Sequence, residues 1–153
     1  MGMDDSDHDD SLYLSTISET GHVPVILEHV TQFARGQGLA DTDGLLLVVR
    51  ELLMNAIVCG NGSDPSLMAL VRVRPKSGLF EVQIDDEGEG FDFESLVLVL
   101  PEDPQTLTKR GLVLVNELSR DLTFERGGSR VKANVYPDGR SPAAGRRRMG
   151  AKV

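Results

Sequence analysis

The sequence predicts an α+β fold, a two-layer α/β sandwich in which helices cover one face of a mixed, mostly antiparallel sheet. The first observation behind this prediction is the order of the expected elements: a strand, two helices, two strands, a helix and two strands. The second is the composition, because 40% hydrophobic and 26% charged residues in a chain of 153 are ordinary for a globular protein. We therefore expect one domain with one core, over residues 11–137.

A strand and two helices are expected in the first part of this domain. Apolar and polar residues alternate over 11–18, which predicts the strand. Apolar residues at helical spacing predict a first helix over 25–36. Asp41 is a suitable N-cap for a second helix, whose apolar face continues to Gly60, and a loop over 60–65 follows it.

Four further strands and one helix are expected in the second part. The strands are indicated by β-branched and aromatic residues between turn signals, over 66–73, 79–84, 122–125 and 130–136. A turn over 74–78 joins the first two of these strands, and Gly127-Gly128 joins the last two. Apolar spacing predicts the helix over 111–118, and the polar stretch 85–90 is expected to be a loop.

The composition argues against several function classes. A formal net charge of -8 and a pI near 4.8, with 5% aromatic residues, argue against general nucleic-acid binding, which needs a basic surface. The single cysteine, Cys59, cannot form an internal disulfide or a four-cysteine zinc site, so a reducing compartment is favoured. The sequence shows no targeting signal and no apolar stretch close to the roughly 20 residues of a membrane span. We therefore expect a cytoplasmic protein that contacts neither nucleic acid nor a membrane.

The two ends of the chain carry opposite charge. Residues 1–10 contain five Asp and no Lys or Arg, whereas residues 138–153 carry a net charge of +4. Both segments have the composition of disordered chain, so we expect a disordered acidic N-terminus and a flexible basic C-terminal tail. Two interpretations of the tail stay open: contact with nucleic acid or an acidic partner, and a solvated segment without a partner.

The first motif that carries chemistry pairs Glu51 with Asn55. The two residues are four positions apart in the predicted second helix, so both side chains project from one face. A carboxylate and a carboxamide placed in this way can serve a proton transfer and a divalent cation, since Mg²⁺ prefers oxygen ligands. The alternative is an ordinary exposed helix face.

The second motif is Asp-Asp-Glu-Gly-Glu-Gly-Phe over 85–91, directly after a predicted strand. Gly88 and Gly90 let the backbone approach a flat or charged ligand closely, where a Cβ would collide. A carboxylate beside such a turn can accept a hydrogen bond from an exocyclic amine. The alternative is an acidic turn that leaves a strand, and any phosphate near these acids needs Mg²⁺ or another cation.

The third motif is Lys109-Arg110-Gly111-Leu112, at the start of the predicted helix. Free backbone N–H groups and the positive end of the helix dipole favour a phosphate at such a place, and two cations precede it. The alternative is a helix start with a basic surface.

The three motifs in this order and spacing resemble the GHKL ATPase superfamily of gyrase and histidine kinases. The short single-domain form, with a strand and two helices before the first motif, is most similar to the anti-sigma-factor serine kinases of bacterial partner-switching systems. The resemblance covers residues 12–136, and it implies the Bergerat-type fold of histidine kinase-like ATPases. It also implies ATP and Mg²⁺ as cofactors.

The resemblance assigns a role to each motif residue. Glu51 takes the place of the general base that draws a proton from a serine hydroxyl or from water. Asn55 takes the place of the Mg²⁺ ligand, and Asp86 that of the carboxylate that accepts a hydrogen bond from the adenine amine. Gly88 and Gly90 let the chain pass the nucleotide.

The same resemblance places the phosphates at the third motif. Gly111 and Leu112 begin the helix that cradles them, and the segment over 94–110 forms a lid over ATP. In the family this motif usually starts with a Gly, where this chain has Lys109, so Lys109 or Arg110 is expected to contribute a positive charge to the γ-phosphate. A second departure is Cys59, which stands where the family commonly has His.

Three functions follow from the resemblance. The first is a protein serine kinase that binds a sigma factor, inhibits it, and phosphorylates an anti-anti-sigma partner of the STAS type. The second is a nucleotide-binding or purely steric regulator without turnover. The third is a detached histidine kinase catalytic domain, which is disfavoured because the chain shows no upstream helix pair with a phosphoacceptor His. A homodimer through the N-terminal strand and helix is also implied.

Overall fold

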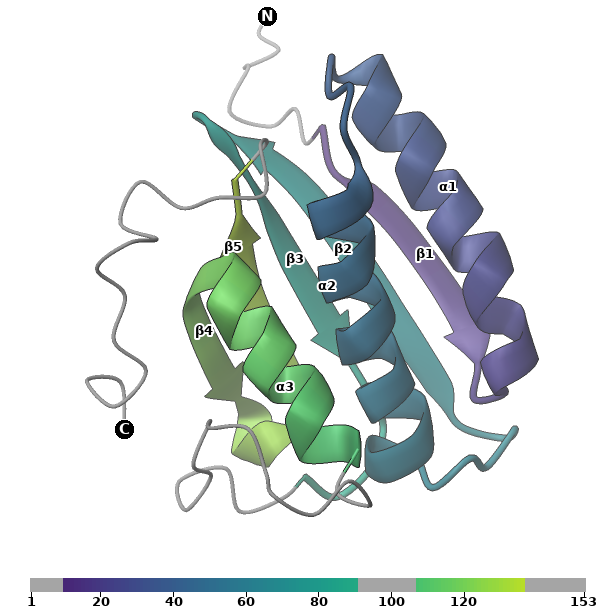
Figure 1. The fold of residues 1–153 in the computed structure, drawn as a ribbon. Helices are drawn as coiled ribbons and strands as arrows, with labels where there is room; N and C mark the ends of the chain where they lie inside the picture. Colours follow the sequence, from purple (N-terminus) through teal and green to yellow (C-terminus); the bar gives the residue numbers. More distant parts are fainter. Residues whose placement is uncertain (1–9, 91–106, 137–153) are drawn as a thin grey trace, which may run out of the picture.

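The computed structural model describes residues 10–90 and 107–136, which form one five-stranded sheet with three α-helices on one face (Figure 1). The strands are β1 Leu12–Ile17, β2 Met68–Lys76, β3 Leu79–Asp85, β4 Ser119–Glu125 and β5 Arg130–Val135. The helices are α1 Val23–Gly36, α2 Asp43–Asn55 and α3 Leu107–Leu118. The sheet order is β1-β2-β3-β5-β4, and each of these neighbouring pairs is antiparallel. The predicted α+β sandwich is confirmed, with an antiparallel sheet throughout the described residues.

The first two helices begin close to their predicted starts. Helix α1 begins at Val23, and Pro24 lies in its first turn, where the missing N–H of proline costs no hydrogen bond. Helix α2 begins after Thr42 as its N-cap, one residue later than the sequence predicts. Asp41 still supplies the expected hydrogen bond, because its Oδ1 accepts from the backbone N–H of Asp43 at 3.0 Å.

The helical run ends at Gly60 as the sequence predicts, but α2 itself ends at Asn55 and the last turn is wound more widely. After Asn55 the chain continues without a break as a π-helical turn, Ala56–Gly60. The N–H of Asn61 closes this turn on the carbonyl of Ala56 at 2.8 Å. A single π-turn at the end of an α-helix is common at functional sites, because it redirects the groups that follow it.

The β2–β3 hairpin is longer than predicted. The sequence predicts a turn over 74–78, whereas β2 runs to Lys76 and only residues 77–78 turn. Arg74 lies opposite Glu81 in the ladder, and the Lys76 Nζ lies 3.8 Å from Glu81 Oε2. These cross-strand charge pairs extend the ladder past a proline that otherwise favours a turn.

The sheet turns its apolar face toward the helices. The buried side chains on this face come from the three central strands: Ala69, Val71, Val73, Phe80, Val82, Ile84, Val131, Ala133 and Val135. Polar and charged side chains alternate with them and lie on the other face, as expected for an antiparallel sheet with one side covered. The core therefore lies between the sheet and the helix layer.

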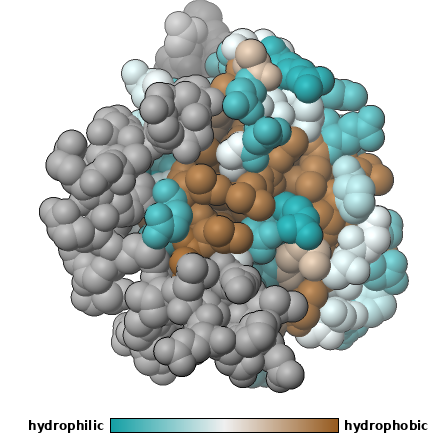
Figure 2. All heavy atoms as spheres, in the orientation of Figure 1, coloured by the Kyte–Doolittle hydropathy of each residue, from teal (hydrophilic) through white to brown (hydrophobic). Residues whose placement is uncertain are grey.

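Helix α2 is the centre of the helix layer. It packs against α1 on one side and α3 on the other (Figure 1). A run of apolar residues over 45–49 surrounds its axis, and Figure 2 shows apolar side chains gathered over the middle of this layer. Neighbours on both sides and the sheet beneath hold α2, so the functional side chains that it carries have a fixed base.

Several expectations fall outside this description. The expected disordered N-terminus, except Asp10, the expected basic tail over 138–153 and most of the segment 94–110 lie outside the described residues. Among the helices within the described ranges, none has both the length and the apolar character that a membrane crossing requires.

Candidate functional site

Glu51 lies where α2 and α3 meet. Its side chain is 18% exposed, and a Cβ added to Gly111 of α3 would overlap its Oε1. Its other oxygen, Oε2, accepts a hydrogen bond from Nη1 of Arg50 at 2.5 Å. The absence of a side chain at position 111 therefore lets α3 pass close to the carboxylate oxygen that Arg50 does not hold.

Asp86 lies where the π-turn that follows α2 ends. The chain leaves β3 after Asp85, and the Asp86 carboxylate meets the end of the π-turn, where a Cβ on Gly60 would overlap it. A Cβ on Gly88 would in turn overlap the Gly60 carbonyl oxygen. These close approaches require glycine at both positions, and the second motif is consequently locked against the end of the α2 π-turn.

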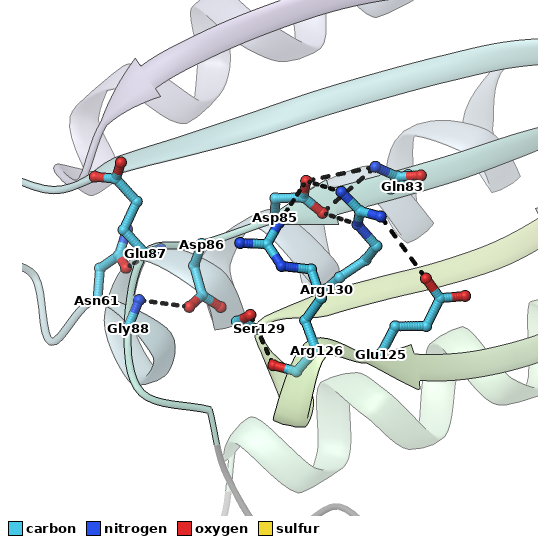
Figure 3. Close-up of polar contacts among 10 residues, drawn as sticks. All are labelled: Asn61, Gln83, Asp85, Asp86, Glu87, Gly88, Glu125, Arg126, Ser129 and Arg130. Carbon is cyan, nitrogen blue, oxygen red and sulfur yellow. Dashed lines mark hydrogen bonds and ion pairs between the residues drawn. The ribbon is translucent and has the colours of Figure 1, made fainter.

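Backbone groups fix the orientation of the Asp86 side chain (Figure 3). The N–H of Gly88 donates to Asp86 Oδ1 at 2.8 Å, and the N–H of Asp86 donates to the Ser129 carbonyl at 2.8 Å. Asp86 Oδ2 has no hydrogen-bond donor among the described residues. An acceptor with a fixed direction is therefore available to a ligand.

Burial raises the pKa of Asp86 above its ordinary value of 3.8. The negative charge of neighbouring Asp85 adds to this shift, whereas the Gly88 N–H and the charge of Arg126 oppose it. Asp86 is only 8% exposed, so it has lost most of its contact with water. A carboxylate with a raised pKa in a partly desolvated position is typical of a functional site.

Asp85 faces the other side of the sheet and has different partners. Its two oxygens accept hydrogen bonds from Nε and Nη2 of Arg130 at 2.9 and 3.0 Å (Figure 3). Arg126 Nη1 lies 3.6 Å from Asp85 Oδ2. These bonds raise the pKa of Arg130 above its usual range. Asp85 is therefore a structural partner of the β3–β5 pair.

The end of the second motif packs on the β4–β5 connection. Gly90 has a φ of 87°, in the left-handed region that glycine tolerates. A Cβ at this position would also overlap the carbonyl of Gly127, which lies in the short 3-10 turn Arg126–Gly128. The sequence indicated Gly127 as part of a hairpin turn only, because its contact with Gly90 joins segments far apart in the chain.

The family model of the histidine kinase-like ATPase domain matches residues 17–135. The chain belongs to this family. No curated protein matches the sequence significantly. The family match confirms the predicted GHKL-type ATPase domain, and its narrower resemblance to anti-sigma-factor kinases stays a prediction.

Membership in this ATPase family implies that the site binds ATP, usually with Mg²⁺. The described residues fit such a ligand, because glycines stand where the backbone has to approach closely and a Cβ would fill the space. Asp86 offers an oriented acceptor, which the resemblance expects to meet the adenine amine, and Gly88 and Gly90 shape the adjacent backbone. These are the roles that the resemblance assigns to the second motif.

Asn55 is the residue that fits Mg²⁺. It is the last residue of α2, one turn after Glu51, and it is partly buried. The described residues contain no cluster of three or more His, Cys, Asp or Glu that could hold a metal ion. Mg²⁺ in phosphate sites needs only one or two protein ligands, because phosphate oxygens and water complete its coordination. A single amide oxygen is therefore sufficient.

The predicted start of the third helix is wrong. The sequence predicts that Gly111 and Leu112 open it, whereas α3 begins at Leu107, about one turn earlier. Leucine, lysine and arginine are strong helix formers, so the helix extends through Lys109 and Arg110. Gly111 lies at the crossing of α3 and α2, and Leu112 is 2% exposed within the core.

This earlier start changes which groups are available to a phosphate. The first four N–H groups of a helix lack partners within it, and in α3 these belong to residues 107–110. Lys109 and Arg110 therefore contribute backbone N–H groups at the positive end of the helix dipole. Their side chains lie outside the described part of the chain.

Asn61 is a structural residue of the site that the sequence did not reveal. It lies in a Gly-, Ser- and Pro-rich stretch, which predicts a loop and nothing more. In the structure it is 4% exposed, and its side-chain amide bonds to three other segments. No local pattern distinguishes it from a loop asparagine, since all its partners are distant in sequence or lie in other elements.

Proposed function

We propose that this histidine kinase-like ATPase domain is a cytoplasmic protein serine kinase. It uses ATP and Mg²⁺, binds and inhibits a sigma factor, and phosphorylates a serine of an anti-anti-sigma antagonist of the STAS type. The observation that carries the proposal is the position of Glu51, a carboxylate at the α2–α3 crossing whose Oε1 approaches Gly111 so closely that only glycine fits there. The π-turn that continues the same helix meets the Asp86 acceptor.

Glu51 would act as the general base in this proposal. Its Oε1 takes the proton of the serine hydroxyl, while Arg50 holds Oε2 and so fixes the direction of the carboxylate. The serine oxygen would form a bond to the γ-phosphorus of ATP while the bond to ADP breaks and ADP leaves, and Mg²⁺ held by Asn55 would supply positive charge to the phosphate oxygens. The chain itself contributes positioning. Asp86 orients the adenine of ATP, and the first turn of α3 offers N–H groups to the phosphates.

The partners and the compartment rest on the resemblance. The strand and helix that precede α2, which carries Glu51, and the compact single domain are the form typical of anti-sigma-factor kinases. A single cysteine favours a reducing compartment. A homodimer through the N-terminal strand and helix belongs to the same proposal.

A second candidate is a nucleotide-binding regulator without turnover. The observation that favours it is the ion pair between Arg50 and Glu51, which engages one of the two oxygens of the carboxylate. The Lys at position 109, in place of the glycine usual in the family, favours it as well. In this case ATP would control the binding of the sigma factor without being consumed.

Labelling with radioactive γ-phosphate tests the proposal. The protein is incubated with Mg-ATP and a STAS-type antagonist of the same organism, and phosphoserine is expected on the antagonist. Glu51→Gln should lower the rate by about 10²- to 10⁴-fold, the usual contribution of a general base. Glu117→Gln, an exposed residue of α3, is the matched control and should leave the rate unchanged.

The two candidates give different results. Labelling that survives Glu51→Gln undiminished removes Glu51 from the role of base. Binding of Mg-ATP without labelling supports the regulator without turnover, and Arg50→Ala should then restore labelling if the ion pair is the cause. Absence of any Mg-ATP binding in calorimetry contradicts both candidates. Recovery of a sigma factor in a pull-down with ATP tests the partner independently.

A further inference from the structure

Asn61 is buried directly after the α2 π-turn and joins three other segments. Its Oδ1 accepts a hydrogen bond from the backbone N–H of Glu87 at 2.8 Å. Its Nδ2 donates to Ser18 Oγ at 2.8 Å and to the Met68 carbonyl at 3.0 Å. The amide thus connects the end of β1, the start of β2 and the loop after β3, and each of its three contacts is short enough to fix a position.

Glu87 completes this arrangement from the other side. Its Oε1 accepts a hydrogen bond from the backbone N–H of Met68 at 2.7 Å. Met68 is therefore held at its N–H by Glu87 and at its carbonyl by Asn61. The loop that follows β3 is consequently fastened to β2 at two points, although no regular strand pairing extends that far.

The fastened peptide is the one that follows Asp86. The N–H that Asn61 binds belongs to Glu87, the next residue, and Gly88 then donates its own N–H to Asp86 Oδ1. Gly60, directly before Asn61, forms the surface against which the Asp86 carboxylate rests. Residues 60 and 61 together therefore set both the backbone and the side-chain position of Asp86.

We propose that Asn61 is a positioning residue that sets the nucleobase preference of this site. It holds the Glu87 peptide so that the Asp86 carboxylate stays directed at an exocyclic amine, and it ties this acceptor to α2, which carries Glu51 and Asn55. The inference rests on the proposed nucleotide binding and adds a base-selecting device to it. Asn61 touches no ligand in this role and acts through Asp86.

Loss of the Asn61 amide has a defined consequence. The Glu87 N–H and the Met68 carbonyl lose their bond to this amide, while the Ser18 hydroxyl keeps the bond that it donates to the Leu67 carbonyl. The loop then shifts to find other partners, because unpaired buried polar groups are costly. The Asp86 carboxylate loses its fixed direction, and the bond to an amine weakens more than any contact with phosphate.

The test compares two nucleotides that differ at this amine. Mg-ATP and Mg-ITP are titrated into wild-type protein and Asn61→Ala, since hypoxanthine carries a carbonyl where adenine carries the amine. Wild type should prefer ATP, and Asn61→Ala should reduce that preference about tenfold, the value of one hydrogen bond to a charged group. The affinity for Mg-ITP should change little.

The ratio of the two affinities separates positioning from general stability. Both titrations use the same preparation, so a partly unfolded fraction lowers both apparent affinities equally and cancels in the ratio. Val73→Ala, in the core part of β2, is the control that lowers stability and should leave the ratio unchanged. If Asn61→Ala does not fold, Asn61→Ser keeps a short polar side chain and should shift the ratio in the same direction by less.

An unchanged ratio in the folded Asn61 variant, or a wild-type protein that binds both nucleotides equally, overturns the inference. In both cases nucleotide binding itself is intact, so the proposed function is unaffected. A wild-type protein that binds neither nucleotide contradicts the proposed function, and the inference that rests on it is then overturned with it.

Discussion

Asp85 and Asp86 are neighbours in sequence but lie in two different regions of the molecule. Asp85 ends β3 on the open face of the sheet, where Arg130 binds both of its oxygens. Asp86 turns toward the helix layer, where its carboxylate packs against Gly60 and accepts a hydrogen bond from the N–H of Gly88. One carboxylate is fully paired and supports the sheet, and the other is oriented but still has an oxygen for a ligand. The strand period of two, and not the residue type, decides which role each side chain takes.

The largest effect is expected from adding a side chain at the close contact between Gly88 and Gly60, beside Asp86. Gly88→Ala places a Cβ against the carbonyl of Gly60, and neither backbone can yield easily. We expect Mg-ATP affinity to fall by about a hundredfold and the free energy of unfolding by about 1–3 kcal/mol, as for an overpacked site. Calorimetry and urea unfolding measure the two quantities.

The control for this variant is Gly21→Ala. A Cβ at Gly21 has open space around it, and its φ does not require glycine. Its nucleotide affinity should equal that of wild type. Full binding by Gly88→Ala would show that the contact between residues 60 and 88 does not shape the nucleotide site.

The next largest effects are expected from variants in which each of the two carboxylates is replaced by an amide, one at a time. Asp86→Asn should lower Mg-ATP affinity about tenfold, since an N–H₂ group then faces the amine of the base, and should leave stability equal or higher. Asp85→Asn should lower the free energy of unfolding by about 1–3 kcal/mol, because Arg130 loses a charged partner, and should leave affinity nearly unchanged. Each variant is the control of the other. Parallel changes in both quantities would contradict the division of roles.

Part of this division was predictable from the sequence. The alternation over 79–84 followed by Asp-x-Gly-x-Gly predicts a strand and a close turn, because these signals are local, whereas the acceptor role of Asp86 comes from the resemblance and stays a prediction. The spacing of Glu51 and Asn55 on one helix is local as well. The sequence did not reveal Asn61 or the contact of Gly90 with Gly127, since both depend on tertiary packing between distant segments.

The start of α3 is a second feature that could not be predicted from the sequence. A glycine before an apolar helical pattern is a reasonable start signal, and the sequence therefore predicts that the helix begins at Gly111. In the structure Gly111 is needed inside the helix, because Glu51 of α2 leaves no room for a Cβ. The reason for that glycine lies on another helix, so a single segment cannot disclose it.

A smaller effect is expected in the pH dependence of the free energy of unfolding. The folded protein holds the pKa of Asp86 above its ordinary value of 3.8. Between the ordinary pKa and the raised pKa, the folded state therefore binds more protons than the unfolded state. Stability from this group is therefore present at low pH and is lost as pH rises through the raised folded pKa. Asp86→Asn removes that loss, so its stability relative to wild type should rise over this window and stay constant above it.

Asp64 gives the opposite sign and is the control. Backbone and side-chain hydrogen bonds from Ser66 lower the pKa of Asp64, so its contribution is lost as pH falls. Asp64→Asn should therefore lose relative stability at neutral pH and recover it in acid. Urea unfolding between pH 3 and pH 8, roughly the range over which carboxylates titrate, measures both variants. Curves of equal sign would contradict the burial of Asp86 as the cause.

The smallest effect concerns Arg126, the cation that acts on both carboxylates. Its guanidinium lies 3.6 Å from Asp85 Oδ2, and its charge also lowers the pKa of Asp86 against the dominant effect of burial. Arg126→Gln should therefore raise the pKa of Asp86 further, as followed by NMR titration of the carboxyl carbon. Stability should change by less than about 1 kcal/mol, because the side chain is 54% exposed and its charge is screened.

Arg35→Gln, at the end of α1, is the control and should leave the titration of Asp86 unchanged. High salt should reduce the difference between Arg126→Gln and wild type, since screening weakens exposed charges first. An unchanged Asp86 titration at low salt would show that the two carboxylates are electrically separate, and that Asp86 depends on its glycine surface and peptide bonds alone.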